Sequence, residues 1–475
     1  MNNISQSELL LQDANNQVGS FLKQFKVSDI FKQCNGYKQK GFSVIQLFTY
    51  LVALMFQPLS TYMSMRVGSY KEPFSKNTIR RFCNNASINW HKFLRILSQK
   101  LVDEFMRPAT SENREEFFIF DDTPFHKAGK KTELVCKFYN HVNNKFELGY
   151  RILTLLWTDG YSNVPVDFAP LSSGNEDLIV CKAKPCDGRT LAGRIRKQAC
   201  MSAPDLILMM LSQAVAAGHK AKYVLFDTWF ATPKGIMDIK RNQDMDVIAM
   251  AKKSSKIFYE YNGEQHDVKE IFSRCKKRRG RSKYLLSVEV NLLQKKNGKI
   301  LERMPAKLVY VRNKAKKKDW IAIISTDTSL SEKEIIRRYG YRWNIEVYFK
   351  TCKQYLKYTR ECQSPSFDSL TAHLTVANVR YMMLSMFQRA NTDHRSVGEI
   401  FYLYVEEVAE ITFDHSMKLI MIALLTTIKE FFCFNEEQMT AFVQQFIENL
   451  PNYLRAPLEA CADVYGNLKL SQLAH

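Results

Sequence analysis

The sequence predicts an α/β protein in which a strand-rich central segment is flanked by helical regions. Three observations support this prediction. Residues 1 to about 112, and those beyond about 363, have apolar positions at helical spacing. Between them, short apolar runs rich in β-branched and aromatic residues are punctuated by Gly, Asn and Pro. From 233 to 318 short strand candidates are separated by basic turns, which indicates a β-rich segment.

The length and composition indicate a folded protein of several domains. A chain of 475 residues has room for two to four domains of about 100–200 residues. With 46% hydrophobic residues it can bury a sizeable core. No apolar run is long enough to span a bilayer, and the N-terminus lacks a basic region followed by an apolar one. We therefore expect a cytoplasmic protein, with no membrane partner, whose eleven scattered cysteines are reduced thiols.

The charge distribution indicates a polyanionic partner. The formal net charge is +20. Residues 274 to 318 contain 17 basic and 2 acidic residues, so most of the excess lies in this segment. A concentrated positive charge of this kind is typical of nucleic-acid binding. Its run RCKKRRGRSK places Arg278, Arg279 and Arg281 where they could follow a DNA backbone.

The N-terminal region contains a candidate DNA-binding helix. Helices are predicted over 43–56, 75–85 and 88–106. The short helix at 75–85 follows a turn and has Ser75 as a plausible N-cap. It places Lys76, Arg80 and Arg81 close together. Two interpretations stay open: a helix that contacts DNA, or a solvated basic face of a helical bundle.

Acidic residues stand next to three of the predicted strands. The run EFFIFDD at 116–122 stops at Asp121 and Asp122, and YVLFD at 223–227 stops at Asp227. A third strand, at 319–326, is followed by a predicted helix that carries Glu346. The remaining predictions are strands at 149–160, 163–171, 245–251, 283–293 and 306–313, and helices at 204–221 and 329–356.

Three carboxylates of this kind are what a Mg²⁺ or Mn²⁺ site requires. Hard divalent ions prefer carboxylate oxygens and retain water ligands. Two such ions about 3.5–4 Å apart can bind both the attacking and the leaving oxygen of a phosphodiester. Crowded carboxylates without a cation would repel one another. Each aspartate alone could equally be an ordinary residue at the end of a strand.

The helix around Glu346 places cations on the same face as this carboxylate. At about 100° per residue, Tyr339, Arg342, Glu346, Lys350 and Lys353 form one stripe less than a quarter-turn wide. Such a face could hold DNA phosphates beside a metal ligand. The alternative is a solvated row of ion pairs at i,i+4 spacing. That alternative explains neither Tyr339 nor the strand-end aspartates.

These residues resemble the insertion-sequence-4 (IS-4) family of DDE transposases. Tyr339, Arg342, Glu346 and Lys353 match its Tyr-x2-Arg-x3-Glu-x6-Lys signature, and FDDT at 120–123 and VLFDTWF at 224–230 resemble its two aspartate regions. The resemblance implies a ribonuclease H-like (RNase H-like) core, 113–232 and 319–362, with a β-rich insertion at 233–318. Residues 1–112 would bind DNA, and residues 363–475 would form a helical region for dimerisation.

The resemblance also implies functions for individual residues. Asp121, Asp227 and Glu346 would be the catalytic, metal-binding triad for two Mg²⁺ or Mn²⁺ ions, with Asp122 as an alternative to Asp121. DNA phosphates would be bound by Tyr339, Arg342 and Lys353, and less clearly by Lys350. The implied protein is a bacterial insertion-sequence transposase, nucleoid-associated when it binds DNA. As a homodimer it would cleave terminal inverted repeats, through hairpin ends, and join them to target DNA.

Two other functions stay open from the sequence. An RNase H-like nuclease would hydrolyse DNA without strand transfer, but it has no clear need for the Tyr339, Arg342 and Lys353 face. An inactive or domesticated transposase would bind DNA without cleaving it, although all three carboxylates are present. We expect Trp229 to pack in the interior rather than stack on a base. The basic segment at 187–197 is interpreted as either a mobile loop or a DNA contact.

Overall fold

The computed structural model describes residues 16–390, except 57–59, 67, 69, 110–113, 141–142, 280–281, 283, 298, 314–318 and 360–361, and a few residues between 437 and 449. The chain divides into two units. One unit comprises Met1–Gln17, Phe56–Pro58 and Phe401–His475, and lies almost entirely outside the described residues. The other, Val18–Met55 and Leu59–Ile400, contains every helix and strand discussed below.

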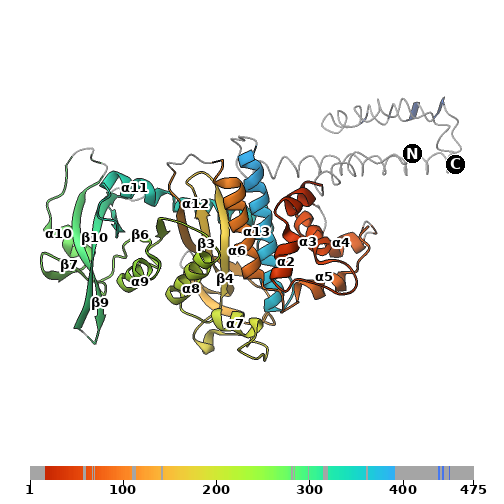
Figure 1. Ribbon diagram of the computed structural model, residues 1–475, viewed down its shortest axis with the longest axis horizontal. Coiled ribbons are helices and arrows are strands. Elements are labelled where there is room, and N and C mark those ends of the chain that lie inside the picture. The colour runs from red at the N-terminus through yellow and green to blue at the C-terminus, as the bar shows by residue number, and fades with distance from the viewer. Residues whose placement is uncertain are drawn as a thin grey trace. The chain divides into compact units, whose positions relative to one another are not determined.

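A group of helices precedes the sheet. After a helical segment at 16–24, these are α2 (Val27–Gln33), α3 (Val44–Ala53), α4 (Thr61–Arg66), α5 (Lys76–Cys83) and α6 (Trp90–Leu101), followed by a π-helical turn at Val102–Met106. Their core is aromatic, because Phe31 packs against Phe48, Trp90 and Phe93. The Asn89 side chain caps α6 by accepting a hydrogen bond from the Lys92 backbone N–H. Figure 1 shows these helices in red and orange.

One large mixed sheet contains all the named strands of the described residues. Its strands are β1 (Phe117–His126), β2 (Cys136–Asn140), β3 (Lys145–Thr158), β4 (Asn163–Leu171), β5 (Tyr223–Phe226), β6 (Asp246–Met250), β7 (Tyr259–Tyr261), β8 (Glu264–His266), β9 (Leu286–Lys296), β10 (Lys299–Arg312) and β11 (Trp320–Ser325). The order is β2-β3-β1-β5-β6-β11-β10-β9-β7-β8, and β4 also pairs with β3.

The first half of the sheet positions the acidic residues. Strand β3 is antiparallel to both β1 and β4, whereas β5 is parallel to β1 and β6 is parallel to β5. The parallel pairs need crossover connections, which α8 (Ala203–Ala216) and α9 (Pro233–Gln243) supply. Strand β6 and helix α9 thus belong with β5, although the predicted insertion begins at residue 233.

The second half of the sheet is built from the predicted insertion. Strand β11 pairs with β6 on one side and with β10 on the other. Strands β9 and β10 form a long antiparallel hairpin, and β9 pairs in turn with β7. A short helix, α10 (Val268–Arg274), precedes this hairpin and has a capping box at Asp267 and Glu270. The strands from β7 to β10 therefore extend the central sheet.

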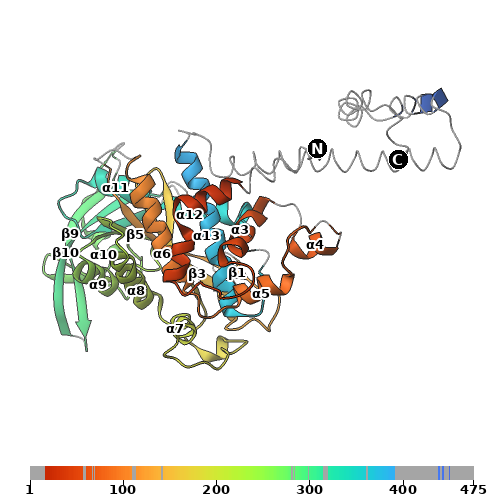
Figure 2. The same ribbon diagram turned by 45° about the vertical axis from the view of Figure 1, so that its right-hand side comes forward.

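Helices cover both faces of β1. Phe117 packs against Tyr341, between α11 (Glu332–Gly340) and α12 (Trp343–Gln354), so α12 covers the face that contains Phe117. The next residue along the strand, Phe118, points the opposite way and meets His219. His219 in turn hydrogen-bonds to Ser98 of α6. Figures 1 and 2 show α12 and α6 next to this part of the sheet.

Most of the elements predicted from sequence are confirmed. Strand β4 matches its prediction at both ends, α3 and α5 lie within the predicted ranges, and α8 begins one residue before its predicted range. The sequence analysis missed β2, β7, β8 and α10, which are short and have little periodicity. The helix predicted over 329–356 is wrong as a single helix, because it is divided into α11 and α12.

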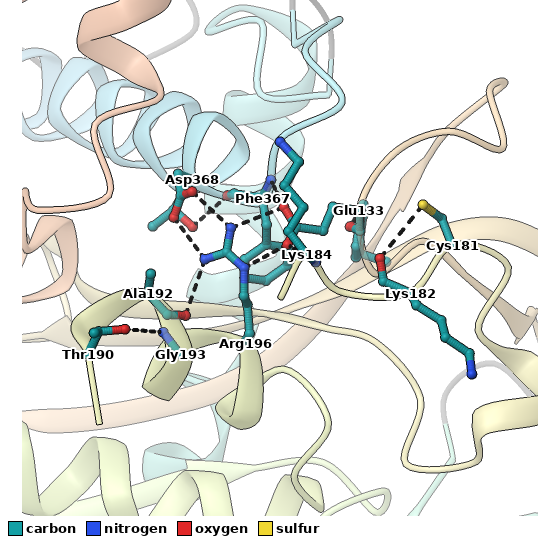
Figure 3. A network of polar contacts seen from close by, with 12 residues as sticks. Glu133, Cys181, Lys182, Lys184, Thr190, Ala192, Gly193, Arg196, Phe367 and Asp368 are labelled. Carbon is teal, nitrogen blue, oxygen red and sulfur yellow. Dashed lines mark hydrogen bonds and ion pairs between the residues drawn. The ribbon is translucent and has the colours of Figure 1, made fainter. Parts of the chain in front are cut away.

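The segment at 187–197 is a second correction, because much of it is helix α7 (Leu191–Gln198). Its Arg196 is buried and forms ion pairs with Glu133 and with Asp368 of α13 (Phe367–Ala390). Figure 3 shows the guanidinium between the two carboxylates. Arg196 therefore has a structural role in the interior, and the mobile-loop interpretation is wrong for this residue.

Helix α13 is buried on nearly all of its faces, which differs from the amphipathic helices expected in this region. It contacts α3, α5, α6 and β4, and this burial on several sides explains why its apolar residues are not confined to one stripe. Even so, no helix within the described part of the chain has the length and apolar character required to cross a bilayer. The remaining predicted C-terminal helices lie outside the described residues.

Candidate active site

The register of β1 and β5 brings two aspartates together. The two strands are parallel, and Phe120 of β1 pairs with Phe226 of β5. Asp121 and Asp227 are the next residues, so they lie side by side on strands about 4.8 Å apart. The prediction that this strand stops at Asp121 and Asp122 is wrong, because β1 continues to His126 alongside β3. The pairing with β5 does end there, which leaves that edge of β1 open from Asp121 onwards.

Asp121 and Asp122 have different surroundings, because successive residues of a strand point to opposite faces. The Asp122 carboxylate accepts hydrogen bonds from Nε and Nη2 of Arg151, the second at 2.6 Å. The Asp121 carboxylate lies 3.7 Å from Nη1 of Arg342 and accepts the Asp122 backbone N–H at 2.8 Å. Of the two aspartates, only Asp121 therefore lies on the face of β1 that α12 covers.

A tight turn joins the two helices that carry the signature residues. Tyr341 N–H donates to Arg338 O at 3.1 Å, and Arg342 N–H donates to Tyr339 O at 3.0 Å. These i to i−3 bonds keep the backbone close to helical, so Tyr339 and Arg342 remain neighbours. Gly160 is required beside the turn, because a Cβ there would lie 3.0 Å from the Tyr341 ring, and its φ is +85°.

Arg342 connects the signature helix to the strand carboxylates. Its Nη2 donates a hydrogen bond of 2.5 Å to Glu346, one turn along α12, and its Nη1 approaches Asp121. The guanidinium carbon lies 5.8 Å from the centre of the Tyr339 ring. The Tyr339 hydroxyl and Arg342 Nε are buried and have no hydrogen-bonding partner of standard geometry among the described residues. The structure therefore brings together Asp121, Asp227, Tyr339, Arg342 and Glu346.

The electrostatics of this cluster reflect crowded, partly desolvated charges. Burial, together with the charges of Asp122 and Asp227, raises the pKa of Asp121 to about 7. The Arg342 guanidinium acts in the opposite direction. Burial also raises the pKa of the Tyr339 hydroxyl well above its ordinary value. An ionised Asp121 therefore requires a nearby cation, and Arg342 supplies one.

The carboxylates provide the oxygen donors that Mg²⁺ or Mn²⁺ prefers, but they are not gathered round one point. In the part of the chain that the structure describes, no three His, Cys, Asp or Glu side chains form a group that could hold a metal ion. Arg342 extends between Glu346 and Asp121 and accounts for the separation. Asp121 and Asp227 are positioned for a shared ion, whereas Glu346 could join them only after exchanging its bond to Arg342.

The other predicted DNA-binding residues lie at varied positions. Lys350 is exposed on α12. Lys353 is half-buried, and burial lowers the pKa of its ammonium group. Among the described residues no ion pair or hydrogen bond to Lys353 is present. Arg278 and Arg279 are exposed ahead of β9, where the Arg278 guanidinium lies 4.4 Å from the Tyr284 ring centre. Arg281 lies outside the described residues.

The sequence analysis missed or misjudged two residues next to the carboxylates. Arg151 of β3 was not identified, although its antiparallel partner strand carries Asp122. Trp229, expected to pack in the interior, is 52% exposed. Arg151 and Lys252 both lie within 6 Å of its ring centre, at 5.8 and 5.4 Å. The available signal in the sequence was Asp122, an acidic residue on the neighbouring strand, which could have indicated Arg151 as its partner.

A comparison with protein families identifies the class of the chain. The DDE superfamily endonuclease family matches residues 48–294, which is more than half of the chain. The protein therefore belongs to the DDE superfamily endonucleases. The matched range includes Asp121 and Asp227 and ends before Tyr339 and Glu346. Such enzymes are nucleases or transposases that act on DNA and generally use divalent metal ions. No curated protein matches the chain.

Proposed function

We propose that the protein is a DNA transposase of the IS-4 type, which binds the ends of its element and catalyses metal-dependent strand cleavage and strand transfer. One observation carries the proposal. The register of β1 and β5 sets Asp121 beside Asp227, and α12 places Arg342 and Glu346 over them. The order β4-β3-β1-β5-β6, with β3 antiparallel to its neighbours, supports an RNase H-like core.

In this proposal Asp121, Asp227 and Glu346 hold two Mg²⁺ or Mn²⁺ ions. Asp121 is preferred over Asp122, whose carboxylate is already paired with Arg151. When bound, the ions would activate the attacking oxygen and stabilise the leaving oxygen of a phosphodiester. The protein itself supplies three carboxylate donors, two of them fixed by the sheet. If Glu346 bound a metal ion, its bond to Arg342 would have to be exchanged, and the guanidinium would then be free for a DNA phosphate.

The remaining signature residues would position the DNA. Tyr339, Arg342 and Lys353 would contact backbone phosphates near the element end, and exposed Lys350 could extend this contact along α12. Arg278, Arg279 and Arg281 would contact phosphates further away, from the insertion. The N-terminal helices would add a separate DNA contact. Dimerisation through residues 363–475, and hairpin formation at the cleaved ends, are parts of the proposal that follow from the resemblance.

The decisive experiment separates binding from chemistry. Glu346→Gln removes a metal-binding charge while preserving size, so we expect it to bind DNA carrying the element end but not to nick it with Mg²⁺. Glu104→Gln, an exposed residue beyond α6, is the matched control and should cleave normally. Retained cleavage by Glu346→Gln would contradict the site. Joined products with target DNA distinguish a transposase from a nuclease that only hydrolyses.

A further inference from the structure

Two adjoining hollows form a groove beside the N-terminal helices, and none of the three carboxylates is among the residues that line them. The first is a cavity of about 540 Å³ between α3, α4 and α5 on one side and α13 with its preceding segment on the other. The second, about 480 Å³, shares Tyr62 and Lys76 with the first. We call these two hollows the N-terminal groove. Figures 1 and 2 show α3 and α5 near α13, with α4 further out.

The N-terminal groove is cationic and contains no acidic residue among the described residues that line it. Its cations are Arg66, Lys76, Arg80 and Arg380. The side chains of Lys76 and Arg80 are exposed, and no ion pair within the described residues neutralises them. In a chain with 48 acidic residues, a hollow without a carboxylate favours an anionic ligand.

The walls of the groove are held in place before any ligand binds. Helix α5 is anchored by its buried Ile79 and Phe82, and Lys76, Ile79 and Arg80 lie on the face of the helix that lines the first hollow. The Arg380 guanidinium is buried and donates to backbone carbonyls at the end of α3 and to Leu356 O at 3.1 Å. Leu356 follows α12, so Arg380 connects this wall to the helix that carries Glu346.

The groove fits a chain of phosphates better than a single one. Cations recur along both hollows, and hydroxyl groups of Ser60, Thr61 and Ser364 line the first. Lys and Arg together with Ser and Thr are the side chains that contact DNA phosphates most often. The opposite wall, at Gln363 and Ser364, follows α12 in sequence. A DNA strand bound in the groove would therefore contact both the N-terminal helices and the proposed catalytic core.

We propose that the N-terminal groove binds the phosphate backbone of duplex DNA between α5 and the segment 362–369, so that end binding and the catalytic helix share one rigid support. This inference rests on the proposed function, since DNA is its ligand. It goes beyond DNA binding by the basic helix α5 alone. It assigns half of the DNA contact to the segment 362–369, which follows α12.

The first test removes the charges of α5. Lys76→Gln combined with Arg80→Gln is compared with Lys137→Gln combined with Lys220→Gln, two exposed lysines on other elements. Binding of a short DNA duplex is measured in EDTA across a salt series. We expect about tenfold weaker binding for the groove variant, and a salt slope reduced by about two, with the control close to wild type. Equal affinities for the two variants would overturn the proposal.

The second test addresses the other wall. Gln363→Glu is isosteric and introduces a negative charge beside the proposed phosphates, without altering α5. Several-fold weaker binding of the duplex is expected, and affinity unchanged from wild type would show that α5 binds alone. A mononucleotide that competes with the duplex at equal concentration would also overturn the proposal, since the groove would then prefer a free anion.

Binding in EDTA makes the two hypotheses independent. If Glu346→Gln cleaves like wild type while the groove variants bind weakly, the active-site proposal fails and the groove stands. If the groove variants bind like wild type and Glu346→Gln loses cleavage, the groove proposal alone is wrong.

Discussion

The Arg342 guanidinium joins Glu346, to which it donates a 2.5 Å hydrogen bond, to Asp121, which lies 3.7 Å away. One cation therefore lies between carboxylates that the proposed chemistry would assign to metal ions. A guanidinium in this position lowers the repulsion among the acidic residues and keeps the site compact. It also means that metal ions and Arg342 compete for Glu346.

This competition predicts how metal ions affect stability. In Arg342→Gln the carboxylates lose their internal counter-ion, so we expect the free energy of unfolding in EDTA to fall by about 2 kcal/mol. Mg²⁺ should restore much of this loss, and should raise the melting temperature of the variant more than that of wild type. Thermal unfolding in EDTA and in MgCl₂ measures both effects.

Arg151→Gln is the control for this experiment. It removes the partner of Asp122, on the side of β1 away from Arg342. We expect a loss of stability that is the same with and without Mg²⁺. Should Mg²⁺ stabilise Arg342→Gln no more than wild type, the carboxylates around Arg342 do not bind the metal.

The sequence predicted the parts of the fold that have strong local patterns. Strands β4, β5 and β11 are apolar runs bounded by turn residues, and α8 has a clear helical period and a Ser202 cap. The shape of the sheet could not be predicted in this way. Pairing of β11 with both β6 and β10 depends on contacts between distant segments, and no local pattern encodes them.

The candidate site, too, could be predicted only in part from the sequence. Composition and helical spacing identified Tyr339, Arg342 and Glu346 as neighbours, and the structure places Asp121 and Asp227 next to them. The choice between Asp121 and Asp122 depended on which face of β1 each occupies and on Arg151, which comes from another strand. The break between α11 and α12 lies at Tyr341, whose ring packs against Phe117 and beside Gly160 from other parts of the chain. These are tertiary effects, which a single sequence does not reveal.

Asp121→Asn and Asp122→Asn should have opposite effects on both stability and nicking activity. Because burial raises the pKa of Asp121 to about 7, its charge is disfavoured, and Asn should leave stability unchanged or higher while abolishing nicking. Asp122→Asn breaks a part-buried pair with Arg151, so we expect about 3 kcal/mol of destabilisation with cleavage retained in the folded fraction. Urea unfolding and a nicking assay check both. If Asp122→Asn alone abolishes nicking, the first ligand is Asp122.

His219 predicts a component of the acid sensitivity. Burial lowers the pKa of its imidazole from 6.5 to about 4, and its Nε2 lies 3.1 Å from Arg95 O. Between these pH values the unfolded chain binds a proton that the folded chain does not, so stability falls as the pH decreases from 6.5 towards 4. By pH 5 this contribution amounts to about 2 kcal/mol.

The measurement compares His219→Gln with wild type by urea unfolding at pH 7.5 and pH 5.0. The variant lacks the titrating group, so it should lose about 2 kcal/mol less than wild type between the two pH values. Groups that titrate in both proteins cancel in this difference. An identical loss in both proteins would show that His219 does not titrate as its burial implies.

The last prediction concerns the buried ion pairs of Arg196. Glu133 accepts hydrogen bonds from Arg196 Nε at 2.6 Å, from Lys184 N–H at 2.8 Å and from Phe367 N–H at 3.1 Å (Figure 3). Although burial opposes the charge, these bonds hold the pKa of Glu133 below its ordinary value. Glu133→Gln would leave a buried guanidinium with only Asp368 as its ionic partner, and would place an amide NH₂ among donors.

We therefore expect Glu133→Gln to reduce the free energy of unfolding by about 3 kcal/mol, because it breaks a buried ion pair and leaves the guanidinium with one carboxylate where it had two. Arg189→Gln, which removes an exposed pair with Asp187, is the matched control and should have little effect. Chemical denaturation of both variants gives the comparison. If the two variants unfold at the same denaturant concentration, Arg196 does not depend on Glu133 for its place between α7 and α13, and Asp368 alone holds it.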